Sequence, residues 1–217
     1  MIDVKRSRPA PPSLAEKKGW RGEDVLEALH GDFQGKCYLC ESLVAGPGSF
    51  EVDHRRPRSA GGDKFDWDNL FPICPPCNIR RRKKWPEGGL LDPAGGDEVE
   101  RRLVQEIAGW DESNRVIPSF RAVALVEPAS VNTADELDHI HNDHSGPGAM
   151  KAADLRNAIT LRHSRVMGAY LAYRNTSDPV QRVRSERELR RLVARTAPYT
   201  ALMRSAIRED LPESFFD

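Results

Sequence analysis

Two pairs of cysteines with the spacing of metal ligands enclose the polar residues that could do chemistry. The pairs are Cys37 with Cys40 and Cys74 with Cys77. A two-residue spacing turns both sulfurs of a pair to the same side, so two pairs can supply the four thiolates of a tetrahedral zinc site. The alternative, a pair of disulfides, is less favoured in a reducing compartment. We therefore predict one structural Zn²⁺.

Four further residues in this stretch have side chains suited to hydrolysis at a second metal. A neutral His54 can take a proton from water near pH 7. Asp53 and Asn78 offer hard oxygen ligands for Mg²⁺ or Mn²⁺. Asn69 can fix a loop through amide hydrogen bonds to backbone groups. An isolated Asp-His pair is usually an ordinary strand end, and it is the flanking cysteine pairs that favour a catalytic interpretation here.

The elements that must position these residues are two strands and a helix. Apolar and polar residues alternate over 50–54, and residues 69–73 are mostly apolar, so each segment is predicted to be a strand. A loop with Gly61-Gly62 lies between them. Prolines 75 and 76 suit the first turn of a helix, and residues 78–84 contain no helix breaker. The order strand, loop, strand, helix would bring Asp53 and His54 close to Asn78, and zinc would replace the core that so small a unit lacks.

Charge is balanced over the chain but not along it. The 217 residues include 33 basic and 33 acidic ones, which predicts no overall attraction to polyanions. Residues 54–85, however, carry nine basic and only three acidic side chains. We interpret part of this basic segment as a phosphate-binding surface, the alternative being a solvated helix face. The predicted nucleic-acid contacts are Arg55, Arg80, Arg81, Lys83 and Lys84.

The chain as a whole is predicted to be an α+β protein with four regions. They are an N-terminal arm with a short helix at 22–30 (1–32), the zinc module (33–86), a mixed region (87–148) and a helical C-terminal region (149–217). Apolar spacing predicts a helix over 97–110 and an extended segment over 116–126. The C-terminal region is expected to hold helices over 150–174, 180–196 and 199–209.

A run rich in acids and histidines lies at residues 135–144. It contains three histidines and four acidic residues, which could suggest another metal site. We interpret it instead as an acidic, solvated loop that precedes a glycine-rich break.

The central module resembles the HNH endonucleases of the ββα-metal type. The resemblance is carried by EVDHRRPRSAGG at 51–62, WDNL at 67–70 and CPPCN at 74–78. It implies that Asp53 and Asn78 bind a catalytic Mg²⁺ or Mn²⁺, that His54 is the general base, that Asn69 holds the active-site loop, and that the substrate is DNA. Asn78 stands where the motif's name has a histidine, and Arg81 where many members have lysine.

A looser likeness extends over most of the chain. The segments at 4–6, 9–14, 37–41, 67–70 and 90–93 and the helical tail are similar to the HNH nuclease subunit of Septu-type and retron-associated anti-phage systems. That likeness implies a defence role and an SMC-like or ABC-type ATPase partner. The alternatives are a zinc-ribbon nucleic-acid-binding module and an adaptor subunit, both without catalysis.

No feature of the sequence indicates a membrane. No window approaches the eighteen or so apolar residues of a membrane span. An apolar signal-peptide core is also missing after Met1, where charged residues and prolines follow. We expect a cytoplasmic protein.

Overall fold

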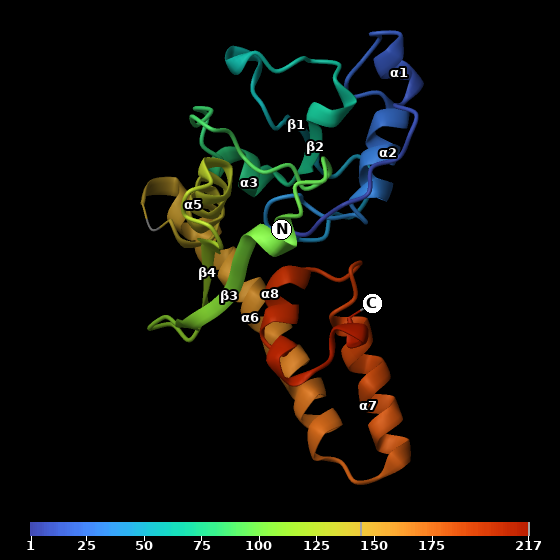
Figure 1. Cartoon of the computed structure of the whole chain (residues 1–217), viewed down its shortest axis with the longest axis vertical. Coiled ribbons are helices and arrows are strands. Elements are labelled where there is room, and N and C mark those ends of the chain that lie inside the picture. The colour runs from blue at the N-terminus through green and yellow to red at the C-terminus, as the bar shows by residue number, and fades with distance from the viewer. Residues whose placement is uncertain (144, 217) are drawn as a thin grey trace.

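The computed structural model describes residues 1–143 and 145–216 and shows two small antiparallel sheets surrounded by helices (Figure 1). The strands are β1 (Glu51–His54), β2 (Leu70–Ile73), β3 (Leu103–Trp110) and β4 (Val116–Ala122). The helices are α1 (Pro12–Ala15), α2 (Glu23–Asp32), α3 (Pro75–Arg80), α4 (Val99–Arg102), α5 (Pro128–Asn142), α6 (Gly146–Asn175), α7 (Pro179–Leu192) and α8 (Thr200–Ser205). The predicted α+β class is confirmed.

The first sheet is the predicted strand-loop-strand unit. β1 and β2 pair antiparallel, with Asp53 opposite Phe71 and His54 opposite Leu70. All four residues of β2 are buried, which explains its continuous apolar run. α3 follows directly, but it ends at Arg80 and does not continue to residue 84 as predicted. Arg81 is extended, with ψ of 134°, and its guanidinium donates to the carbonyl groups of His54, at the end of β1, and of Arg55.

The helix predicted over 97–110 is wrong. After the short helix α4 the chain becomes strand β3, which pairs with β4 over the length of both strands. The apolar residues Leu103 and Ile107 fit a helix and a strand equally well, so their spacing does not distinguish between the two structures. The segment is a strand because its backbone hydrogen-bonds to β4, and apolar spacing within the segment cannot indicate such a partner.

The prediction of an acidic, solvated loop over 135–144 is also wrong, because Pro128–Asn142 forms helix α5. Leu137, Ile140 and His141 are buried at helical spacing, and the ring of His141 lies 4.6 Å from that of Phe120 on β4. The acidic side chains share this helix with an apolar face that packs on the sheet. His144 lies outside the described residues.

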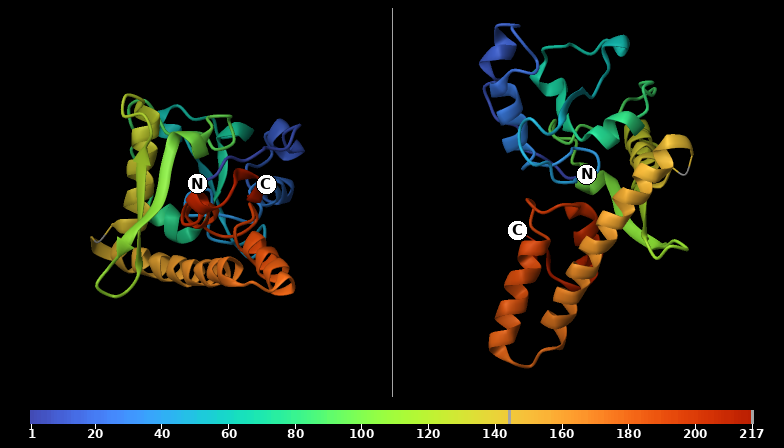
Figure 2. Two further views of the ribbon diagram at one scale, coloured as in Figure 1. Left: turned by 60° about the horizontal axis from the view of Figure 1, so that its bottom comes forward. Right: turned by 180° about the vertical axis from the view of Figure 1, so that it is seen from behind.

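The C-terminal helices agree with the sequence in type and approximate bounds. α6 and α7 form an antiparallel hairpin that projects from the rest of the molecule in opposite views (Figures 1 and 2). The third predicted helix is shorter than expected and is represented by α8 and a 3₁₀ turn at Arg208–Asp210. None of the described helices is long and apolar enough to cross a membrane.

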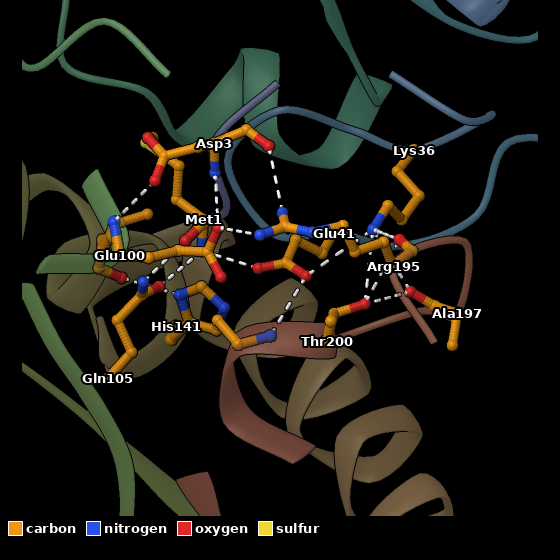
Figure 3. A network of polar contacts seen from close by, with 12 residues as sticks. Met1, Asp3, Lys36, Glu41, Glu100, Gln105, His141, Arg195, Ala197 and Thr200 are labelled. Carbon is orange, nitrogen blue, oxygen red and sulfur yellow. Dashed lines mark hydrogen bonds and ion pairs between the residues drawn. The ribbon is translucent and has the colours of Figure 1, made fainter. Parts of the chain in front are cut away.

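A buried polar network joins the first cysteine pair to the C-terminal segment (Figure 3). Lys36 donates to the carbonyl oxygens of Arg195 and Ala197 and to the Thr200 hydroxyl. Glu41 accepts from the backbone amide of Ala201 at 3.3 Å. Its carboxylate also pairs with the amino group of Met1 at 2.7 Å. Because Lys36 and Glu41 flank the Cys37–Cys40 turn, this turn is held from both ends of the described chain.

The N-terminal arm packs against β2. The guanidinium of Arg6 lies 4.6 Å from the Trp67 ring and 4.8 Å from the Phe71 ring, and it donates to the Leu70 carbonyl at 2.9 Å. Cation–π contacts of this kind are favourable where water is excluded. The arm therefore helps to fix β2, the strand that faces Asp53 and His54.

The buried imidazole of His141 predicts a loss of stability in acid. Burial lowers the pKa of His141 from 6.5 to about 4. Between these pH values His141 binds a proton in the unfolded chain but not in the folded protein. The free energy of unfolding therefore falls as the pH falls, by about 3 kcal/mol at pH 4. Urea unfolding of wild type and His141→Gln at pH 7 and pH 4 measures this. We expect the loss to be smaller in the variant, and equal losses in the two proteins would contradict the assignment.

Candidate active site and zinc centre

The four cysteines come together as the sequence predicted. Their sulfur atoms lie within 4.8 Å of one another, and those of Cys40 and Cys74 are 3.7 Å apart. A tetrahedral site with Zn–S bonds of about 2.3 Å separates its sulfurs by about 3.8 Å. All four residues are free thiols, so the alternative of two disulfides is not formed. The cluster fits one structural zinc ion, held between the Cys37–Cys40 turn and the start of α3.

His54 is oriented by a backbone carbonyl of the loop between β1 and β2. Its Nε2 atom lies 3.1 Å from the carbonyl oxygen of Lys64. A carbonyl oxygen can only accept a hydrogen bond, so Nε2 carries the proton in the neutral ring. The Nδ1 atom then keeps its lone pair. The imidazole is half-buried, and its ring lies 4.8 Å from that of Trp20.

Asn69 fixes the loop that supplies this carbonyl. Its side-chain oxygen accepts from the Arg56 amide at 2.8 Å, and its side-chain nitrogen donates to the carbonyl groups of Arg56 and Asp63, at 3.0 and 3.2 Å. Asp63 directly precedes Lys64. The buried amide of Asn69, at the end of the loop, therefore connects to its beginning and its middle, and it holds Asp63 next to Lys64, the residue that orients His54.

A glycine allows the loop to close around Asn69. A Cβ atom at Gly62 would lie 1.9 Å from the carbonyl oxygen of Arg56 and 2.8 Å from the Asn69 side-chain nitrogen. Real Cβ atoms do not approach other atoms so closely, so the loop requires glycine at this position.

Of the two predicted cation ligands, Asp53 lies on β1 and Asn78 lies on α3, the helix that contacts this strand. Alternation along the strand places Glu51 and Asp53 on the same face. The Asn78 side-chain nitrogen donates to the Glu51 carboxylate at 2.6 Å, which leaves the amide oxygen of Asn78 available. Glu51 was not singled out from the sequence, although its position two residues before Asp53 would have indicated a shared face.

The Asp53 carboxylate is bound on both oxygens by protein groups. The Tyr38 hydroxyl donates to Oδ2 at 2.7 Å, and the Arg81 guanidinium pairs with Oδ1 in a buried ion pair. Burial raises the pKa of Tyr38 well above its usual value, so this hydroxyl stays protonated. The carboxylates of Glu51 and Asp53 and the amide of Asn78 are hard donors that suit Mg²⁺ or Mn²⁺. A cation at Asp53 would compete with Arg81.

Three of the five predicted phosphate contacts are bound to other parts of the protein. Arg55 donates to the Leu90 carbonyl at 2.6 Å and pairs with Asp92. The buried Arg80 donates to the His139 carbonyl at 2.8 Å. Arg81 pairs with Asp53, as described above.

The other two predicted contacts remain at the surface. Lys83 and Lys84 are exposed. Of the basic run, these two lysines and the exposed Arg82, which lies 3.5 Å from Glu136, face solvent.

Replacing Gly62 with alanine should damage the loop around Asn69. The added Cβ forces the Arg56 carbonyl and the Asn69 amide apart, which we expect to cost about 1–3 kcal/mol. Gly48→Ala is the matched control, because no atom lies within 4 Å of a Cβ built there. Thermal unfolding of both variants measures the difference. Equal stability of the two would show that the close approach at Gly62 has no energetic effect.

Loss of zinc should unfold the module and release the segment docked on it. We expect Cys74→Ser to lose the bound zinc together with amide protection over 37–77, because the ion joins two distant turns. Protection over 195–201 should fall too, since Lys36 and Glu41 hold that segment. Zinc analysis and hydrogen exchange measure this, with residues 179–192 as the internal reference. A folded, zinc-free, active variant would contradict the structural role.

Comparison with known proteins identifies the segment that contains both centres. Residues 37–84 match the family model described as HNH endonuclease. No curated protein and no solved structure matches the chain. The matched segment includes all four cysteines and also Asp53, His54, Asn69 and Asn78. The part of the chain that carries the zinc centre and the candidate active site is therefore similar to the HNH endonucleases, a family of nucleases.

Proposed function

We propose that this protein is a metal-dependent endonuclease that hydrolyses phosphodiester bonds of DNA with His54 as general base. The observation that carries the proposal is the contact of His54 Nε2 with the Lys64 carbonyl inside the segment that matches the HNH model. This contact leaves Nδ1 as a proton acceptor, as a general base requires.

The residues of the site have separate tasks in this reaction. His54 takes a proton from a water molecule at Nδ1, and the water oxygen forms a bond to phosphorus. The bond between phosphorus and the 3′ oxygen breaks, and that oxygen takes a proton from solvent. Asn69 keeps the loop and hence the imidazole in place. Lys83 and Lys84 supply positive charge beside the site without reading sequence.

Asp53 and Asn78 are the residues that would hold the catalytic Mg²⁺ or Mn²⁺. When bound, such a cation stabilises the negative charge that develops on the phosphate and on the leaving oxygen. Glu51 accepts a hydrogen bond from the Asn78 side-chain nitrogen, so the amide oxygen of Asn78 is left to act as the metal ligand. Arg81 balances the Asp53 carboxylate, so cation affinity depends on how readily this ion pair opens.

Cleavage of plasmid DNA tests the proposal. Wild type should cut with Mg²⁺ or Mn²⁺, and His54→Ala should be slower by about 10²–10⁴-fold, the usual contribution of a general base. His163→Ala is the control, because this half-buried histidine also contacts a tryptophan ring, Trp110 at 5.7 Å, but lies on α6. DNA binding without cutting by wild type, alone or with a cognate ATPase, would favour the zinc-ribbon binding module instead.

Binding of Mn²⁺ tests the ligand assignment separately from cutting. In the His54→Ala protein we expect Mn²⁺ affinity, measured by titration calorimetry, to fall about tenfold or more on adding Asp53→Asn or Asn78→Ala, because each removes one hard oxygen donor or its charge. Adding Asp66→Asn, a change to an exposed carboxylate in the loop between β1 and β2, should leave the Mn²⁺ affinity unchanged. Equal affinities of all these proteins would refute Asp53 and Asn78 as ligands.

We further propose that the protein acts in the cytoplasm as the effector of an anti-phage complex with an SMC-like or ABC-type ATPase. The support is the resemblance of the chain to Septu-type nuclease subunits, together with the projecting α6–α7 hairpin (Figure 2). On α7 Val180 and Val183 are 75% and 58% exposed, beside the exposed Arg184 and Arg187. Co-purification with an ATPase encoded next to the gene, and its loss on Val183→Glu, would test this surface.

A further inference from the structure

An exposed arginine is stacked next to the proposed general base through a tryptophan. The guanidinium of Arg21 lies over the Trp20 ring at 4.2 Å, and the Trp20 ring lies 4.8 Å from the His54 ring. Both residues belong to the segment between α1 and α2, more than thirty positions before His54 in the sequence. Figure 1 shows α1 and α2 at the same end of the molecule as the β1–β2 loop.

Exposed basic residues lie close to this stack in the sequence, next to the acidic residues Glu16, Glu23 and Asp24. Lys17, Lys18 and Arg21 are exposed, and neither Lys17 nor Arg21 has an acidic partner in the part of the chain that the structure describes. Lys18 pairs with Glu16 at the surface, where such pairs are weak. Among the described residues, Lys17 and Arg21 therefore add positive charge without an acidic partner to the segment that contacts His54 through Trp20.

We propose that Arg21, held in place by Trp20, binds a DNA phosphate adjacent to the one that is cut. The proposal rests on the function proposed for His54. Consecutive phosphates of one strand advance by about 3.4 Å along the duplex axis, so a guanidinium that contacts the same indole ring as His54 is close enough to reach a neighbouring phosphate. Arginine is suited to this because its planar group stacks on an aromatic face while its N–H donors remain free for phosphate oxygens.

The stack gives Trp20 a defined task. A free arginine side chain loses rotamer freedom when it binds, and stacking on a half-buried indole restricts the side chain beforehand. Trp20 is a positioning residue, since it acts through Arg21, and Arg21 is the residue that contacts the substrate. This surface complements Lys83 and Lys84, which follow α3 on a different segment of the site.

Salt-dependent DNA binding tests the proposal without cleavage. A fluorescein-labelled DNA duplex is titrated with the full-length His54→Ala protein over a range of salt concentrations. Each phosphate contact contributes about one unit to the slope of log Kd against log salt. Adding Arg21→Ala should reduce the slope by about one. Adding Trp20→Ala should weaken binding in the same direction, and Trp20→Phe, which keeps an aromatic face, should retain it.

Two matched controls separate a local contact from general charge or folding effects. Arg165→Ala removes an exposed arginine on α6, and Trp110→Phe changes the other tryptophan that contacts a histidine. Both should leave the slope unchanged, and the thermal midpoints should show that every variant is folded.

The outcomes distinguish this proposal from the nuclease proposal. An unchanged slope in Arg21→Ala, a reduction of the same size in Arg165→Ala, or absence of duplex binding by the parent protein would overturn the role of Arg21. Cutting by the enzyme with His54 intact is scored separately. A protein that cuts but shows no effect of Arg21→Ala would retain its nuclease assignment and lose this contact, whereas binding that depends on Arg21 without cutting would do the reverse.

Discussion

The structure depends on one constraint, the meeting of two cysteine turns that are more than thirty residues apart in the chain. The sulfurs of Cys40 and Cys74 approach to 3.7 Å, so the segment between them is closed into a loop at its base. This closure sets β1 and β2 side by side and starts α3 at a fixed place. A few buried side chains of β2 and the aromatic contacts of Arg6 then complete a core that is too small to be stable by itself.

The geometry of His54 follows from the same closure by short steps. The β1–β2 hairpin fixes both ends of the long loop, and Asn69, directly before β2, bonds to backbone groups at the beginning and in the middle of the loop. Gly62 leaves room for that amide. The loop then presents the Lys64 carbonyl to Nε2 of His54 and so determines which nitrogen of the proposed base is left to accept a proton. Asn69, whose amide has no acid-base chemistry, thereby positions the proposed general base.

The sequence predicted what depends on local spacing and missed what depends on distant partners. Cysteine spacing gave the zinc site, and strand alternation gave β1 and β2. Residues 97–110 were predicted as a helix because their apolar spacing is compatible with one, and only pairing with β4 makes them a strand. The apolar face of α5 was hidden by its acidic residues, although Leu137 and His141 have helical spacing.

The same limit applies to individual site residues. The contact of Trp20 with His54 joins segments with no shared pattern, so the sequence offered no signal for it. Arg80 and Arg81 looked like free basic residues, yet the guanidinium of Arg80 is bound to α5 and that of Arg81 to β1. In both cases tertiary contacts determine the environment of the side chain, and residue type and spacing alone do not contain them.

The most direct test of the central claim is to follow the oxygen of the attacking water. Cleavage of a DNA duplex in water enriched with oxygen-18, followed by mass analysis of the new ends, shows which bond breaks and what attacks it. The account predicts free 3′ hydroxyls and 5′ phosphates that carry one oxygen from solvent, formed by wild type and far more slowly by His54→Ala. Ends of another kind, or the same products at an undiminished rate from His54→Ala, would contradict hydrolysis by water activated at His54.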